Sequence, residues 1–283
     1  GADALWRDFG AKSVLQDVTF EVPRGRICAL LGRNGSGKTT LLKLLYGLIE
    51  PTHGRSQLLS DSHWPRSDSA LRQTGCVLDG FEPPGGTRLR NLLSLSAAAG
   101  PNFDDSRAAE LLHSHGLRLK QTWSTLSKGQ KRWVLLVMQL CCGCSVLLLD
   151  EPADGLDPQT RIELYQLLRR EANDRELTAL VATHVITDVE RVADDVCILD
   201  GHRILLYAAI EDLREQVQVV DIESAPDTES ALPDGIELLH QVQDETTQMW
   251  LRDKYQRLDK HAIAGEVRRR RATLEELFLA VTS

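Results

Sequence analysis

Residues 32–40, GRNGSGKTT, have the residue types and the spacing that phosphate binding requires. They fit the pattern G-x-x-x-x-G-K-[ST], with Gly32, Gly37, Lys38 and Thr39 in the fixed places. Glycines let consecutive backbone N–H groups point at one anion, and the N-terminus of the following helix adds a partial positive charge. We expect Lys38 to neutralise the β- and γ-phosphates of a nucleotide and the Thr39 hydroxyl to bind Mg²⁺. The loop residues expected to contact the nucleotide are Asn34, Gly35, Ser36, Gly37, Lys38, Thr39 and Thr40.

A second candidate group ends the apolar run VLLLDEP at residues 146–152. Carboxylates at the C-terminal edge of a parallel sheet lie where the ligands of such sheets bind. Asp150 is therefore predicted to hold Mg²⁺, as the corresponding acid of phosphate-loop NTPases does. Glu151 is one residue further on, so it can face a water molecule and act as the general base of hydrolysis. Without a phosphate loop, a solvated turn or a helix N-cap would be the simpler explanation of these two acids.

Short apolar segments that alternate with helical patterns must position these groups. The segment ICALL precedes the phosphate loop and TTLLKLLYGL follows it, and later strand-like segments are GCVL, VLLLD, LTALVATH and DVCILDG. This alternation predicts parallel strands in a layered α/β domain. The apolar run at residues 133–149 is at the lower limit for a membrane span, but Gly143 divides it. We therefore expect a buried helix followed by a buried strand there.

The pattern changes after about residue 215. Alternating segments such as VQVVDIE and IELLHQV surround a loop that contains proline, and the chain ends in the amphipathic segment TLEELFLAVT. We predict a nucleotide-binding domain at residues 1–215 and a small α+β domain at residues 216–283. The arginines at 268–271 suit a solvated strand edge, and contact with anionic lipid is the alternative.

The composition of the 283 residues is that of an ordinary globular protein, with 42% hydrophobic residues. A formal net charge of −8 argues against broad nucleic-acid binding, and residues 1–10 show no signal-peptide pattern. Cys141 and Cys144 form a C-x-x-C motif without a second pair or a histidine cluster nearby. Buried thiols in a reducing compartment explain the six cysteines best, and a zinc or redox role for this pair is the alternative.

Three further motifs follow the phosphate loop in order. They are LSKGQ at 126–130, GLDP at 155–158 and TH at 183–184. Ser127 and Gln130 also fit a capping box at the start of a helix. Together with the phosphate loop and VLLLDE, these motifs resemble the ATP-binding subunit of an ABC (ATP-binding cassette) transporter over about residues 5–210. The implied fold is an α/β phosphate-loop NTPase core of ABC ATPase type, with antiparallel β and helical subdomains and a small C-terminal α+β domain.

The resemblance implies roles for residues outside the phosphate loop. His184 would contact the γ-phosphate and position the attacking water, and Asp157 would reach across a subunit boundary to support catalysis. Phe9 would stack on adenine, although a core aromatic explains a lone Phe equally well. The signature residues implied to contact nucleotide held by a second copy are Ser127, Gly129 and Gln130.

The sequence departs from the family pattern at two positions. Asp79 stands where a glutamine normally contacts Mg²⁺ and water, and a carboxylate can also approach a hard cation. Lys128 stands where glycine is more frequent in the signature, and it adds a cation there. We keep Asp79 as a predicted metal contact together with Thr39 and Asp150.

The resemblance implies an ATPase that hydrolyses ATP to ADP and phosphate with Mg²⁺. Its expected partners are a separate integral-membrane permease and a second copy or a related ATPase chain, with no nucleic acid expected. The expected location is peripheral, on the cytoplasmic face of a membrane. The end of the chain, RRRRATLEELFLAVTS, looks like that of ATPases serving ABC-2 type exporters. The alternatives are a soluble ABC-type ATPase acting on nucleic acid or ribosomes, and a nucleotide sensor with little hydrolysis.

Overall fold

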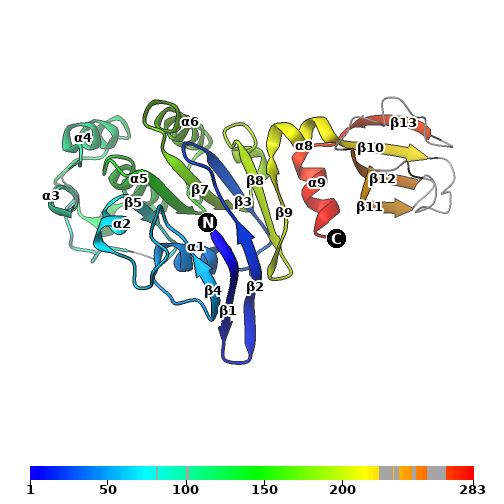
Figure 1. The fold of residues 1–283 in the computed structure, drawn as a ribbon. Coiled ribbons are helices and arrows are strands. Elements are labelled where there is room, and N and C mark those ends of the chain that lie inside the picture. The colour runs from blue at the N-terminus through cyan, green and yellow to red at the C-terminus, as the bar shows by residue number, and fades with distance from the viewer. Residues whose placement is uncertain (81, 100–101, 223–231, 233–235, 244–246, 254–265) are drawn as a thin grey trace. The chain divides into compact units, whose positions relative to one another are not determined.

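The computed structural model describes the chain apart from residues 81, 100–101, 223–231, 233–235, 244–246 and 254–265 (Figure 1). The chain divides into two compact units, Gly1–Ile204 and Leu205–Ser283. The boundary predicted from the sequence, after residue 215, lies within a helix of the second unit, α8 (Ile210–Gln216).

A six-stranded sheet forms the centre of the first unit, and the boundary with the second unit falls within its last strand. Its strands, in spatial order, are β5 (Thr74–Val77), β6 (Val146–Asp150), β7 (Thr178–Thr183), β3 (Ile27–Leu31), β8 (Asp195–Asp200) and β9 (Arg203–Ala209). The pairs β5–β6, β6–β7, β7–β3 and β3–β8 are parallel. Strands β3 and β8 are almost wholly buried, as expected where helices cover both faces of a parallel sheet. The predicted layered α/β architecture is confirmed.

A second, three-stranded sheet in the same unit has the order β2-β1-β4 and is antiparallel. Its strands are β1 (Ala2–Phe9), β2 (Lys12–Phe20) and β4 (His53–Ser56). The burial at the end of β2 alternates, with Val18 and Phe20 buried and Thr19 between them exposed, which is the pattern of a sheet with one face in the core. Phe9 ends β1 and is exposed.

Helices cover the central sheet. They are α1 (Lys38–Tyr46), α2 (Asp68–Arg72), α3 (Leu89–Ala99), α4 (Asp105–Ser114), α5 (Lys128–Leu140), α6 (Pro158–Arg175) and α7 (Ile186–Val189), with a 3₁₀ turn at Trp123–Thr125. Helix α1 packs on β6, α5 on β5 and α6 on β7. Helices α3, α4 and α5 also contact one another and gather at one side of the unit (Figure 1).

The apolar run at residues 133–149 forms two elements, as predicted. Helix α5 ends at Leu140, a short turn contains Gly143, and β6 begins at Val146. Across the part of the chain that the structure describes, no helix is long and apolar enough to span a bilayer.

The second unit is a four-stranded antiparallel sheet with the order β11-β12-β10-β13. Its strands are β10 (Val217–Ile222), β11 (Ile236–Gln243), β12 (Thr247–Asp253) and β13 (Glu266–Arg271). One face of the sheet buries Val220, Met249 and Leu251. On the other face, Val219 and Trp250 pack against Ala280 of helix α9 (Leu274–Val281). The run of arginines lies on β13, at the edge of this sheet.

The start of α9 is held by a capping box and an ion pair that share one side chain. Thr273 accepts a hydrogen bond from the Glu276 N–H, and the Glu276 carboxylate accepts one from the Thr273 N–H. The same carboxylate pairs with the Arg270 guanidinium at 2.7 Å. The hydrogen bonds from Arg270, followed by those from Thr273, lower the pKa of Glu276 to about 2. Arg270 on the edge strand is thus tied to the last helix.

We expect Glu276→Gln to remove the acid sensitivity of this contact while keeping a side chain that can cap α9. The folded-state pKa of Glu276, about 2, lies below its ordinary value of 4.5. Its contribution to stability, up to about 1 kcal/mol for a partly exposed pair, is therefore present above pH 4.5 and lost as the pH falls toward 2. Urea unfolding at a series of pH values should show a shallower loss of the free energy of unfolding in the variant. Glu275→Gln is the matched control, and a native-like slope for Glu276→Gln would contradict the assignment.

Candidate active site

The phosphate loop joins β3 to α1 as the sequence predicts. Gly37 is the N-cap of α1 and has a φ of 109°, in the left-handed region that favours glycine, and a Cβ there would lie 2.8 Å from a methyl group of Leu15. Because this cap has no side chain, it supplies no side-chain oxygen to accept a hydrogen bond from the first turn of α1. The first N–H groups of the helix are therefore left for another acceptor.

Two polar side chains of the loop fit a phosphate group. The Lys38 ammonium donates hydrogen bonds to the carbonyl oxygens of Gly32 (2.7 Å) and Arg33 (3.2 Å), so it is folded over the loop. Burial lowers the pKa of Lys38, while Glu151 and Asp150 raise it. The Ser36 hydroxyl is buried and has no hydrogen-bond partner among the residues that the structure describes. A buried hydroxyl without a partner is costly, and a phosphate oxygen would satisfy it.

Thr39 and Asp150 meet at the end of β6. The Thr39 hydroxyl donates a hydrogen bond of 2.7 Å to the Asp150 carboxylate, which is buried. Burial raises the pKa of Asp150, while the Thr39 hydrogen bond lowers it. No cluster of three or more His, Cys, Asp or Glu side chains suited to a metal occurs within the described residues. A hydroxyl and one buried carboxylate nevertheless fit Mg²⁺, which usually takes few protein ligands and completes its shell with water and substrate phosphates.

Glu151 is held by its backbone and by two side chains. Its φ is 44°, which is uncommon for a residue other than glycine, and its N–H donates to the Ala182 carbonyl at 2.8 Å. One carboxylate oxygen accepts a hydrogen bond from the Thr183 hydroxyl at 3.0 Å, and the other lies 2.8 Å from His184 Nδ1. Glu151 and His184 therefore lie together, and Thr183 is a third member of this group, for which the TH motif predicted no role.

The signature residues and Asp157 form a separate group. The predicted capping box is confirmed, because Ser127 accepts from the Gln130 N–H and the Gln130 side chain accepts from the Ser127 N–H. A Cβ on Gly129 would lie 2.4 Å from the Gly155 carbonyl, so only glycine allows this close approach. Asp157 caps α6 through the Gln159 and Thr160 N–H groups, which lowers its pKa, with the Thr160 hydroxyl as the largest cause.

The signature residues line one cavity of about 270 Å³. Its lining includes Ser127, Gly129 and Gln130 at the start of α5, and Asp157 at the start of α6. Within the described part of the chain, these residues share no hydrogen bond or ion pair with the phosphate loop. The signature group and the phosphate-loop group are therefore two separate groups of residues in this chain.

Two lysines near the start of α5 are paired with acids from neighbouring loops. The Lys128 ammonium lies 2.7 Å from Asp154, in the turn after β6, and this hydrogen bond lowers the pKa of Asp154. Lys131 lies 3.0 Å from Glu82, in the segment after β5. No acidic residue occupies the first turn of α5, so the positive end of the helix dipole is not offset locally. The sequence analysis missed these pairs, because their partners are far apart in the chain.

Asp79 lies close to the metal-binding group but also has a partner on α5. One of its carboxylate oxygens is 3.5 Å from a guanidinium nitrogen of Arg132, whose side chain is buried while that of Asp79 is 77% exposed. The charge of Asp79 also contributes to raising the pKa of Asp150. Asp79 therefore stands between the predicted metal site and the signature helix.

Phe9 is not a core aromatic, since 47% of it is exposed. The Arg7 guanidinium lies 4.3 Å from the centre of its ring. The exposed ring can offer a face for stacking, as the sequence predicted. Within the described residues, no hydrogen bond or ring contact joins Phe9 to the phosphate loop.

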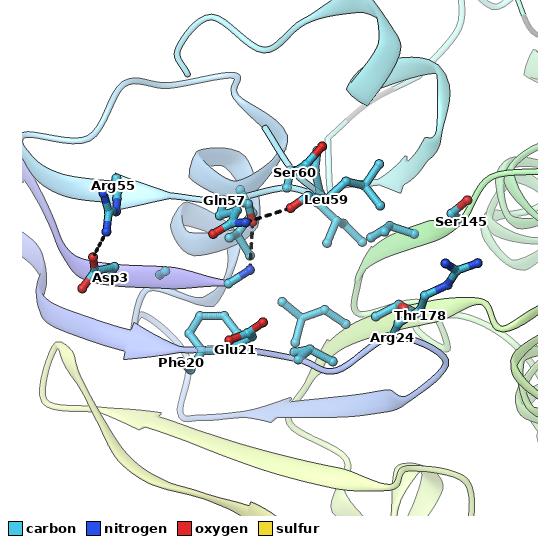
Figure 2. Close-up of a pocket in the computed structure, with 18 of the residues that line it drawn as sticks. Asp3, Phe20, Glu21, Arg24, Arg55, Gln57, Leu59, Ser60, Ser145 and Thr178 are labelled. Carbon is cyan, nitrogen blue, oxygen red and sulfur yellow. Dashed lines mark hydrogen bonds and ion pairs between the residues drawn. The ribbon is translucent and has the colours of Figure 1, made fainter. Parts of the chain in front are cut away.

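Figure 2 shows another cavity of the first unit, of about 730 Å³. Its lining includes Ser145, which precedes β6, and Thr178, which begins β7. These residues lie at the N-terminal ends of the parallel strands, whereas Asp150 lies at the C-terminal end of β6. Asp3 and Arg55 at the rim form an ion pair of 2.8 Å with each other. This cavity is therefore distinct from the candidate active site.

Comparisons with known proteins show which family the chain resembles. A family model described as "ABC transporter" matches residues 15–154. The ABC transporter ATP-binding protein YtrB of Bacillus subtilis (strain 168) is 30% identical over 226 residues, which are 80% of this chain and 76% of that protein. The aliphatic sulfonates import ATP-binding protein SsuB of Rhodopseudomonas palustris (strain BisA53) is 36% identical over 71% of this chain and 70% of its own length. A solved ATP-binding subunit of an ABC transporter has a TM-score of 0.69 and 29% identity, covering 76% of this chain and 91% of its own.

We expect Asp79→Asn to raise, by about tenfold, the Mg²⁺ concentration that gives half-maximal ATP turnover. The substitution removes a negative charge beside Thr39 and Asp150, which are predicted to bind the metal, and it keeps the shape of the side chain. The measurement is ATP hydrolysis at fixed ATP with the Mg²⁺ concentration varied. Glu82→Gln is the matched control, since Glu82 follows the same strand and pairs with Lys131. If Asp79→Asn does not change the Mg²⁺ dependence, Asp79 does not bind the metal. Its pair with Arg132 would then be its main interaction.

Proposed function

The chain belongs to the ABC transporter family as an ATP-binding subunit with ATPase activity, and we propose that it powers a separate membrane permease through the residues described above. The observation that carries the proposal is the convergence of Lys38, Thr39, Asp150 and Glu151 at the C-terminal edge of one parallel sheet. Ligands of such sheets bind at this edge. Attachment to the permease on the cytoplasmic face of the membrane belongs to the same proposal.

The phosphate loop binds and orients ATP in this proposal. Lys38 leaves the carbonyl oxygens of Gly32 and Arg33 for the β- and γ-phosphates, and Ser36 gains the hydrogen-bond partner that it lacks among the described residues. Thr39 and Asp150 would hold Mg²⁺, which neutralises phosphate charge and polarises the phosphoryl oxygens when bound. Phe9 stacks on the adenine ring.

Glu151 takes the proton of the attacking water. Thr183 and His184 donate to its two oxygens, and each carboxylate oxygen keeps a second lone pair that can accept a proton. The positive φ fixes where the side chain leaves the backbone. Both constraints favour one orientation of the carboxylate, which is what a general base requires. In this proposal His184, which is 56% exposed, also contacts a phosphate oxygen.

The second half of the site comes from another copy of the chain or a related ATPase. Ser127, Gly129 and Gln130 surround the positive end of α5, and no acidic residue offsets it in the first turn. The proposal is that this end meets the γ-phosphate held by the partner's loop, with Asp157 beside it. Two copies joined head to tail would then enclose two ATP molecules.

We expect Glu151→Gln to lower ATP turnover by about 10²–10⁴-fold while ATP binding persists, because only the proton acceptor is lost. The variant should also form a stable dimer with ATP, since hydrolysis no longer separates the two copies. Turnover is measured on the purified chain with its membrane partner, and mass is measured by size-exclusion chromatography with light scattering.

Glu176→Gln, at an exposed ion pair with Arg24, is the control for the removal of one charge. Equal turnover in Glu151→Gln and the native chain would remove Glu151 from its role as the base. Monomers alone, at high protein and ATP concentration, would count against the two-copy arrangement.

Export is the proposed direction of transport. The support is the end of the chain, residues 268–283, which resembles ATPases of ABC-2 type exporters and forms β13 and α9. SsuB is an importer by its name, but its match covers 71% of this chain. The match to SsuB therefore leaves part of this chain outside the comparison, and the proposed direction depends on the end of the chain.

Inside-out membrane vesicles from cells that produce the chain test the direction. Their cassettes face the medium, so added ATP should drive compounds from a cell extract into the vesicle lumen, as mass spectrometry of the lumen would show. Vesicles carrying Glu151→Gln give the background. ATP-dependent accumulation only in right-side-out vesicles loaded with ATP would reverse the proposed direction.

A further inference from the structure

The hairpin that carries Phe9 borders the phosphate loop. Strands β1 and β2 pair with Phe9 opposite Lys12, so Phe9 lies next to the turn between them. Two residues beyond Lys12, Val14 packs against the cap of α1, since a Cβ on Gly37 would lie 3.1 Å from the Val14 carbonyl oxygen. A nucleotide whose phosphates occupy the loop can therefore bring its base to this pair of strands.

Arg7 lies over one face of the Phe9 ring. The carbon of its guanidinium group is 4.3 Å from the ring centre, which is within the range of a cation–π contact. Phe9 is nevertheless 47% exposed. Because Arg7 covers one face, the exposed part of the ring consists of its other face and its edge.

The segment between α1 and β4 holds the guanidinium in this position. Arg7 Nη1 donates a hydrogen bond of 2.7 Å to the Glu50 carbonyl oxygen. Thr52 in the same segment binds β1 on both sides of Arg7, because its N–H donates to the Trp6 carbonyl oxygen and its hydroxyl accepts from the Asp8 N–H, each at 2.9 Å. The chain that leaves the helix of the phosphate loop thus fixes Arg7 relative to Phe9.

A cation behind the Phe9 ring changes what the open face can bind. Phe lacks the hydroxyl with which a Tyr side chain can fix its orientation by a hydrogen bond, so the contact with Arg7 takes that role. The face of an aromatic ring carries partial negative charge, and a cation on one face draws the π electrons toward itself. The opposite face then repels the π electrons of a stacked base less strongly. The contact therefore favours one orientation of the ring and stacking on its open face.

We propose that Arg7 is a positioning residue for the base of the bound nucleotide. Its guanidinium holds and polarises the Phe9 ring, and adenine stacks on the opposite face, so that the cation, the ring and the base form one stack. This inference rests on the stacking of adenine on Phe9 in the proposed function. Arg7 acts on the base alone, so the affinity for phosphate groups does not depend on it.

Binding of ADP and of inorganic pyrophosphate to the purified full chain, each with Mg²⁺, separates the base from the phosphates. Arg7→Met keeps a long side chain and removes the cation, and it should raise the Kd of ADP by about threefold to tenfold in isothermal titration calorimetry. The Kd of pyrophosphate, which has no base, should not change. Arg7→Lys retains a cation and should raise the Kd of ADP less than Arg7→Met does. Equal weakening of ADP and pyrophosphate, or tighter binding of ADP, would overturn the proposal.

Phe9→Leu distinguishes this inference from the proposed function. If Phe9→Leu leaves the Kd of ADP unchanged, adenine does not stack on Phe9 and both proposals about the base are wrong. If Phe9→Leu raises the Kd and Arg7→Met does not, the stacking stands and only the role of Arg7 is wrong.

The variant with both substitutions tests whether Arg7 acts through the ring. Its Kd for ADP should equal that of Phe9→Leu alone, because the cation has no effect on the base once the ring is gone. Additive losses would contradict the proposal. Arg55→Met, at an ion pair with Asp3 in the same sheet, is the matched control and should bind ADP as the native chain does. Weakening by Arg55→Met equal to that by Arg7→Met would count as a general effect on the sheet and overturn the role of Arg7.

Discussion

The parallel pairing of β6, β7 and β3 is the constraint on which the active site depends. In this register Asp150 lies opposite Ala182, and Leu31 lies opposite Thr183. The C-terminal ends of the three strands therefore meet at one edge, where the phosphate loop, the two acids and the Thr183–His184 pair all follow. The buried side chains of these strands fix the register, since a slip by one residue would reverse every side chain. The chemistry at the edge is thus positioned by the hydrophobic core beneath it.

Electrostatics links this edge to the helical part of the first unit. Lys128, Lys131 and Arg132 occupy the first two turns of α5, where they add to the positive end of the helix dipole. Each is paired with an acid from a loop near the active site rather than with an acid of its own helix. Of the three pairs, only Lys128–Asp154 is well exposed on both sides, and such a pair contributes little to stability. Together the three pairs connect the signature helix to the loops after β5 and β6.

Much of the catalytic half of the site could be predicted from the sequence, because each chemical group is adjacent to the element that positions it. The phosphate loop lies between β3 and α1, Asp150 ends β6 and Glu151 follows it, so local patterns were sufficient. The capping box of Ser127 and Gln130 was predictable for the same reason.

Contacts that depend on tertiary structure could not be predicted in this way. Asp79 and Arg132 are 53 positions apart, and neither position indicates the other. The backbone of Glu151 was also unpredictable, since sequence preferences would not place a glutamate at positive φ. That conformation has a thermodynamic consequence: it costs about 1–3 kcal/mol, which the buried strands must offset. A glycine at this position would relieve the strain and lose the carboxylate, so the stability of the fold and the activity of the enzyme oppose each other at this residue.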